Sequence, residues 1–135
     1  MKELLAGAHM SIAGGLHKAF DRGLQARCNT IQIFLKNSNQ WKAKVLTEED
    51  RALFQEAQRE SGISPVLAHD SYLINLASPD PALYRKSLDA FVEEMERAVF
   101  LGVPYLVLHP GAHTGAGAGA GIQRVAKALN FALQQ

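Results

Sequence analysis

Short apolar runs alternate with longer amphipathic stretches along the chain, and this alternation limits the folds that it can adopt. Four runs have the length of a strand: Leu4 to Ala8, Thr30 to Leu35, Val66 to Ala68 and Pro104 to Leu108. Their apolar residues are continuous rather than placed at every second position, which is typical of strands covered on both faces. The sequence therefore predicts a parallel sheet with helices packed against it.

Each apolar run is followed by a stretch whose apolar residues have helical spacing. The predicted helices run from Leu16 to Leu24, from Thr47 to Gly62, from Ser78 to Gly102 and from Ile122 to Leu133. Thr47 and Ser78 are good N-cap residues, and a glycine is a common residue just past a helix C-terminus. The Gly/Ala-rich segment before Ile122 is predicted as a flexible loop, or as a loop whose bare backbone approaches a phosphate.

Four strand–helix units in sequence are compatible with two architectures, a small open α/β sheet or part of a (β/α)₈ barrel. A whole barrel needs about 250 residues, and this chain has 135. We expect one domain over residues 1–135 with no internal boundary, and in the second architecture that domain would be about the first four units of a TIM barrel. A fragment or truncated gene product is the expectation that follows.

Composition excludes several classes of protein. Apolar residue types make up 47% of the chain, and 14 basic against 13 acidic residues leave a net charge of +1, so the chain is not intrinsically disordered. The net charge gives no case for nucleic-acid binding, which would need a local patch. No apolar run is long enough to cross a membrane. The single cysteine, Cys28, predicts a small buried apolar residue and a cytoplasmic location.

Three histidines fall at the carboxyl ends of predicted strands, where sites form in parallel α/β folds. They are His9, His69 and His109. The third and fourth strands should be neighbours, so His69 and His109 should face a shared space. Imidazoles gathered in this way indicate a metal or catalytic site, zinc above all. A catalytic zinc needs three protein ligands, whereas Asp70 is typical of a loop residue, so the sequence predicts an incomplete metal site.

Two segments beside this edge have the composition of a DNA-contacting surface. The loop from Lys36 to Leu46 combines three lysines with Trp41, and cations with an aromatic ring suit a phosphate backbone and a stacked base. The alternative is a solvated loop whose tryptophan packs on the barrel rim. Tyr72 and Leu73 could wedge into a duplex, or they could anchor their own loop.

Four segments resemble the endonuclease IV family of apurinic/apyrimidinic endonucleases. They are GAHMSIAGG (Gly7–Gly15), QIFLKNSNQW (Gln32–Trp41), AHDSYLINLASP (Ala68–Pro79) and LHPGAHTG (Leu108–Gly115). The segments occur in order, and the similarity extends from about residue 7 to about residue 133. Each motif alone is weak, but four in register are specific.

The resemblance implies a zinc-dependent TIM barrel that cleaves the phosphodiester bond 5′ to an abasic site in DNA. It implies that His69 and His109 hold one of three zinc ions together with a glutamate from a later strand; manganese or iron are open alternatives. The other family ligands belong to strands beyond Gln135, so this chain alone is expected to be a poor catalyst. The implied partner is double-stranded DNA with abasic sites.

The resemblance also implies which residues contact DNA. His9 lies in the first DNA-contacting loop, and Asn39 stands where some family members place an inserting arginine. Tyr72 and Leu73 match side chains that enter the duplex while the abasic nucleotide flips out. The full implied set is His9, Lys36, Asn37, Asn39, Trp41, Tyr72, Leu73 and His113.

Two other functions compete with this interpretation. A metal-dependent sugar isomerase or epimerase of the xylose-isomerase-like barrels would share the strand-end ligands, but it would need neither the Lys/Trp loop nor the Tyr72–Leu73 pair. A non-catalytic half-barrel binding module would explain the incomplete ligand set. Full-length family members are expected to be monomers, whereas the open edges of a half-barrel favour self-association.

Overall fold

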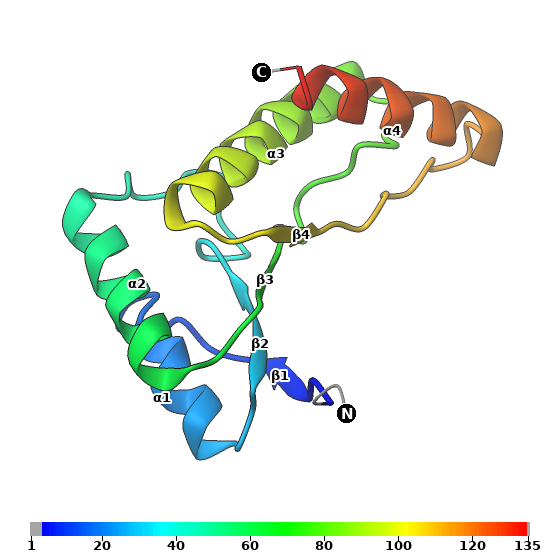
Figure 1. Cartoon of the computed structure of the whole chain (residues 1–135). Helices are drawn as coiled ribbons and strands as arrows, with labels where there is room; N and C mark the ends of the chain where they lie inside the picture. The colour runs from blue at the N-terminus through cyan, green and yellow to red at the C-terminus, as the bar shows by residue number, and fades with distance from the viewer. Residues whose placement is uncertain (1–3, 135) are drawn as a thin grey trace.

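Four parallel strands alternate with four helices in the computed structural model, which describes residues 4–134 (Figure 1). The order of elements is β1 (Gly7–His9), α1 (Lys18–Gln25), β2 (Thr30–Phe34), α2 (Glu48–Ser61), β3 (Val66–His69), α3 (Pro81–Leu101), β4 (Tyr105–Val107) and α4 (Ala118–Ala132). The predicted order of strands and helices is confirmed.

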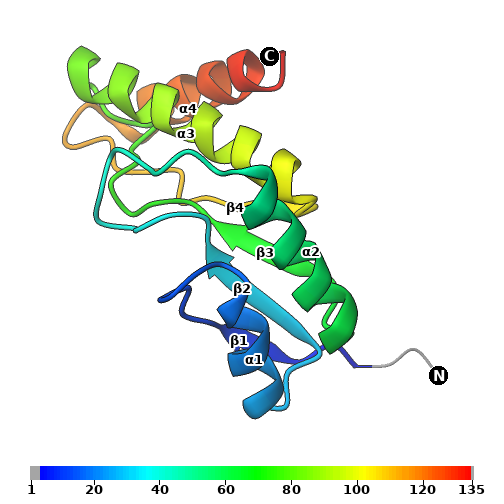
Figure 2. The ribbon, with the colours of Figure 1, turned by 90° about the vertical axis from the view of Figure 1, so that its left-hand side faces the viewer.

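The sheet has the strand order β1-β2-β3-β4, and every neighbouring pair is parallel. Successive helices pack against one another, so they form one continuous layer around the curved sheet (Figures 1 and 2). This is the arrangement of half a (β/α)₈ barrel. All four carboxyl ends of the strands meet at one edge.

Alternating burial distinguishes the two faces of the sheet. In β2, Ile31 and Ile33 are buried under the helices, whereas Thr30, Gln32 and Phe34 are only half-buried. The expectation that both faces are covered is therefore met only on the helical side. The continuous apolar runs belong to a barrel wall whose inner face is open in these four units.

Two apolar clusters form the core. The first joins β2 and β3 to α1 and α2, with Phe20 stacked edge-on against Phe54 at a centroid distance of 5.0 Å. The second packs α3 against α4 through Phe91 and Ala128. Cys28 packs against the first cluster as a small apolar residue, but it is half-buried rather than buried as predicted.

The start of α3 differs from the prediction. Its N-cap is Asp80, whose carboxylate accepts hydrogen bonds from the backbone N–H groups of Ala82 and Leu83, and Pro81 takes the first turn. The Ser78 hydroxyl instead accepts a hydrogen bond from the Asp80 N–H. The sequence holds two successive pairs of a capping residue and a proline, Ser78-Pro79 and Asp80-Pro81, and the second pair starts the helix.

The start of α4 also differs, because the helix begins at Ala118 rather than at Ile122. Part of the Gly/Ala-rich segment is therefore helical. One glycine of this segment has a steric reason, because a Cβ at Gly121 would lie 3.0 Å from the Cβ of His113. No helix of the described residues is both long and apolar enough to cross a membrane.

Candidate metal and nucleic-acid site

The structure brings His69 and His109 together at the carboxyl edge of the sheet. His69 is the last residue of β3 and is largely buried, whereas His109 follows β4 and is exposed. Their ring centroids are 4.9 Å apart. The parallel pairing of β3 with β4 causes this proximity, because the two strands end at the same level.

The backbone fixes the tautomer of His69. Its Nδ1 lies 2.7 Å from the carbonyl oxygen of Asp70. A carbonyl oxygen only accepts hydrogen bonds, so Nδ1 carries a proton, and in the neutral ring Nε2 keeps its lone pair. Histidines that bind metals are held in this way, with one ring nitrogen donating to a carbonyl and the other facing the metal.

The side chain of Asp70 is buried beneath this pair. Burial and the nearby Glu94 carboxylate raise its pKa to about 7, although a hydrogen bond from the His109 backbone N–H acts in the opposite direction. Its Oδ2 has no hydrogen-bond partner within the described residues. Asp70 was expected to be an ordinary loop residue, and its burial is the difference.

The donor types suit zinc, but their number is too small. Within residues 4–134, no group of three or more His, Cys, Asp or Glu side chains is placed to hold a metal ion. His9 does not join the pair. Its ring packs 4.4 Å from that of Phe34, and its Nδ1 lies 3.0 Å from the side-chain nitrogen of Gln32. Partial burial and the neighbouring His69 lower the pKa of His9.

Two further aromatic rings, those of Tyr72 and Phe34, lie next to the two histidines. Tyr72 is 65% exposed, and its ring centroid lies 5.6 Å from that of His69 and 6.1 Å from that of His109. The Phe34 ring packs against both Tyr72 and His69, with its centroid 5.3 Å from that of Tyr72 and 5.7 Å from that of His69. Phe34 was not among the site residues predicted from the sequence, although its position at the end of a strand was a usable signal.

A cavity of about 480 Å³ opens beside His109 and Tyr72. It is lined by the loops that follow β3 and β4. Leu73, the partner of Tyr72 in the predicted wedge, is only half-buried, and its backbone N–H donates to the Ser71 hydroxyl. The tyrosine is therefore the more exposed member of the pair.

The loop between β2 and α2 presents two amides near β2, and two of its three lysines, Lys42 and Lys44, are exposed closer to α2. Asn37 and Asn39 are both exposed, and the Asn37 side chain accepts a hydrogen bond from the Asn39 N–H. Trp41 is half-buried against the second core cluster, with the Lys86 ammonium 4.3 Å from its ring centroid. Of the two alternatives for Trp41, packing on the rim is the one that the structure shows.

Lys36 lies elsewhere than expected for a residue that contacts DNA. Its side chain is 3% exposed, and its Nζ donates to the Trp41 carbonyl at 2.9 Å and lies 3.9 Å from the Glu94 carboxylate. The ammonium is thus directed inward. The reason is a buried carboxylate on α3 that no local sequence pattern around Lys36 reveals.

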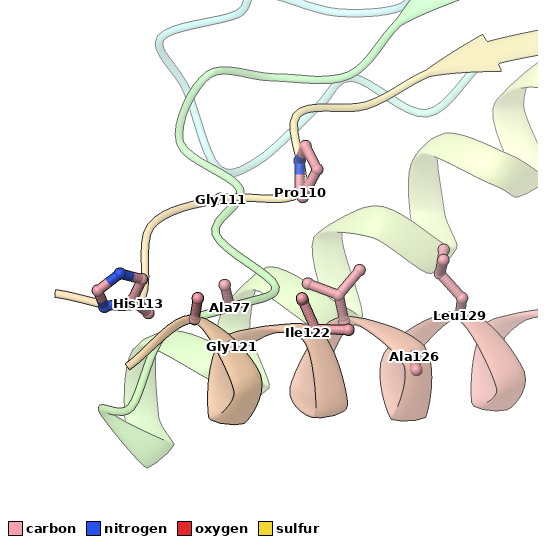
Figure 3. A pocket seen from close by; sticks show the side chains of 10 residues that line it. Ala77, Pro110, Gly111, His113, Gly121, Ile122, Ala126 and Leu129 are labelled. Atoms are coloured by element: carbon pink, nitrogen blue, oxygen red, sulfur yellow. The ribbon is translucent and has the colours of Figure 1, made fainter. Parts of the chain in front are cut away.

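His113 is exposed and lies next to α4. Its Nδ1 accepts a hydrogen bond from the Gly117 N–H. It also lines an apolar groove of about 500 Å³ between the segment after β4 and α4 (Figure 3). Its contacts are therefore with α4 and not with the histidine pair.

Glu94 and Arg97, both buried in α3, were also not predicted from the sequence. A signal was present, because the two charged residues stand among apolar residues at helical spacing, between Phe91 and Leu101. Charged side chains are almost never fully buried unless they are paired.

The geometry has counterparts among known proteins. The family model of the xylose isomerase-like TIM barrel matches residues 20–135. The chain belongs to this family. Membership of this family confirms the TIM barrel, one of the two architectures that the alternation of strands and helices left open.

Relatives within this family agree with the resemblance to endonuclease IV. The chain is 53% identical to a probable endonuclease 4 of Chloroflexus aggregans over 129 residues, which cover 96% of this chain and 45% of that protein. It is also 53% identical to a probable endonuclease 4 of Geobacter sulfurreducens, over 92% of this chain and 42% of that one. The chain thus spans less than half the length of these curated relatives.

Solved structures show the same relationship. The crystal structure of endonuclease IV from Thermus thermophilus matches with a TM-score of 0.79 and 30% identity, covering 94% of this chain and 47% of that one. A D-psicose 3-epimerase matches with a TM-score of 0.66 at 12% identity, which shows a shared fold alone. The resemblance to the endonuclease IV family is confirmed.

Proposed function

We propose that the chain forms the N-terminal part of a DNA repair endonuclease that hydrolyses the phosphodiester bond 5′ to an abasic site. One observation carries the proposal: two imidazoles, one with its Nε2 left free by a backbone hydrogen bond, lie beside an exposed tyrosine. The relatives described as endonuclease 4 support the same class of reaction.

The metal that we infer is zinc, with manganese or iron as alternatives. His69 and His109 would hold it. When bound, zinc would activate water at neutral pH and neutralise charge on the oxygens of the scissile phosphate. A third protein ligand would have to come from outside residues 4–134, within which no group of three or more candidate ligands is found.

The remaining residues would bind and distort the DNA. Tyr72 is exposed beside the histidines, so its ring can replace a base in the stack and hold open the space left by the extruded nucleotide. Leu73 would support it on the half-buried side. Asn37 and Asn39 can donate amide hydrogens to phosphate oxygens.

Three predicted contacts take different roles in the proposal. His9 borders the open face through Phe34 and would meet the DNA strand at the first loop. Trp41 would anchor its loop to the core rather than stack on a base, because its ring is half-buried. His113 would reach DNA only beyond the groove at α4.

The partner that we infer is double-stranded DNA with abasic sites, and the location is the cytoplasm. A sugar epimerase is the second candidate, and the D-psicose 3-epimerase structure supports only the fold that it would need. The exposed tyrosine beside the two histidines favours the nuclease, since an enzyme that acts on a small sugar needs no side chain that inserts into a duplex. A binding module without catalysis is favoured only by the incomplete ligand set.

The test is incision of a duplex that carries a single abasic site. The purified chain and the double variant His69→Ala/His109→Ala are incubated with zinc, and the products are separated on a denaturing gel. Incision on the 5′ side that requires both histidines is the expected chemistry, at whatever rate the two ligands allow. Incision on the 3′ side, or equal incision by the double variant, would contradict the proposal.

A further inference from the structure

Two buried charges on α3 reach the loops that follow β2 and β3. The side chain of Glu94 is 1% exposed, and Arg97 lies one helical turn further along. Neither belongs to the histidine pair. Both connect a helix on the outside of the sheet with the edge where the site forms.

Glu94 connects the two loops to each other. Its Oε1 accepts a hydrogen bond of 3.0 Å from the Ser71 N–H and lies 3.9 Å from the Lys36 ammonium. Lys36 in turn donates to the Trp41 carbonyl, and the Ser71 hydroxyl donates to the Ser38 carbonyl at 2.6 Å. One carboxylate therefore fixes the β2–α2 loop relative to the β3–α3 loop.

Arg97 holds the two ends of the β2–α2 loop. Its Nε and Nη2 donate to the Leu35 carbonyl at 3.2 and 2.7 Å, and its Nη1 donates to the Lys44 carbonyl at 2.8 Å. The planar guanidinium fixes the direction of these bonds. The loop tip with its exposed amides is thus held between two anchored ends.

Judged by stability alone, burying the Glu94–Lys36 pair is unfavourable. Burial raises the pKa of Glu94, and its Oε2 has no hydrogen-bond partner within the described residues. Apolar side chains in place of a buried ion pair often leave a protein equally stable or more stable. Packing of the core therefore does not require the Glu94–Lys36 pair. The distinctive effect of the pair is on the position of the two loops.

We propose that Glu94 is a positioning residue for DNA binding, which through Lys36 and Ser71 holds the two DNA-facing loops as one unit. The inference rests on the proposed function, because these loops carry Tyr72 and the exposed asparagines. It assigns Lys36 to the support of the loop instead of a phosphate contact.

The test uses Trp41, the single tryptophan of the chain, as a reporter of the β2–α2 loop. Glu94→Gln keeps the shape and the acceptor for the Ser71 N–H but removes the charge that attracts Lys36. We expect acrylamide quenching of Trp41 fluorescence to rise about twofold as the loop opens locally. Affinity for an abasic duplex should fall roughly tenfold through misplacement of the loops.

Glu96→Gln is the matched control, because Glu96 is an exposed carboxylate on the same helix. It should change neither readout. Unchanged Trp41 quenching in folded Glu94→Gln would overturn the inference. If the wild-type chain itself shows no preference for abasic DNA, the proposed function fails, and Trp41 quenching still decides whether Glu94 holds the loops.

A double variant separates positioning from stability. In Glu94→Gln/Lys36→Met neither buried charge remains, so the midpoint of urea unfolding should return towards that of the wild type. The link from Lys36 to the Trp41 carbonyl is still missing, so Trp41 quenching and the loss of DNA affinity should persist. If quenching and affinity recover together with stability, the role of Glu94 is structural and the inference is wrong.

Discussion

At the scale of single residues, the hydrogen bond from His69 to a backbone carbonyl determines what the site can bind. The bond leaves Nε2 as the free nitrogen before any metal arrives, so little reorganisation is needed on binding. His109, one strand away, supplies the second imidazole. His9 stands apart, against Phe34.

These differences predict the zinc affinity of three variants. His69→Ala and His109→Ala should each lower the affinity of the chain for zinc by at least about tenfold, since loss of a supporting residue alone costs that much in metal sites. His9→Ala should leave the affinity unchanged. Isothermal titration of zinc into each purified variant checks the prediction, and an equal loss in all three would remove the basis for the pair.

At the scale of elements, caps determine where the helices begin. Thr47 and Asp50 form a capping box at the start of α2: the Thr47 hydroxyl accepts from the Asp50 N–H, and the Asp50 carboxylate accepts from the Thr47 N–H. The hydrogen bonds that the Asp50 carboxylate accepts from the Thr47 N–H and from the Thr47 hydroxyl lower the pKa of Asp50 from its usual value of 3.8. The carboxylate form is therefore favoured in the folded state.

The lowered pKa predicts a dependence of stability on pH. Asp50 stabilises the folded chain above its unfolded pKa, and this contribution is lost as the pH falls through the lower folded pKa. Asp50→Asn should therefore be less stable than the wild type at neutral pH, and the difference should shrink towards pH about 2. Urea unfolding followed by circular dichroism measures both, and a constant difference at all pH values would refute the assignment.

The elements themselves could be predicted from the sequence, but their tertiary neighbours could not. Apolar periodicity located each strand and helix, and the strand ends located the histidines. The direction of Lys36 depends on Glu94, 58 positions along the chain, and no local pattern encodes that contact. The shift of the α3 start from Ser78 to Pro81 has a local cause, since adjacent capping signals compete.

At the scale of the whole molecule, the two outer strands leave the sheet open. All of β1 is exposed, and on β4 Tyr105 is 56% and Val107 37% exposed. Leu106 packs towards the helices, so its two neighbours face the side of the sheet that no helix covers. Open strand edges beside apolar side chains favour pairing with another chain.

The open edges predict that the isolated chain self-associates. Size-exclusion chromatography with light scattering should show species above the monomer mass of 14.7 kDa. Tyr105→Lys/Val107→Lys should shift the population towards monomer, because charge on an edge strand opposes pairing. Val99→Lys, on the exposed side of α3, serves as control. A monodisperse wild-type monomer would contradict the prediction.

Recognition of abasic DNA by the edge with Tyr72 and the two histidines is the central property to test. The most direct measurement compares, by fluorescence anisotropy with zinc present, the affinity of the chain for a duplex with one abasic site and for the intact duplex of the same sequence. We expect the chain to bind the abasic duplex more tightly. Tyr72→Ala should lower that affinity roughly tenfold, the value of one stacked ring, and Val99→Ala should not. Equal affinity for the two duplexes would contradict the account.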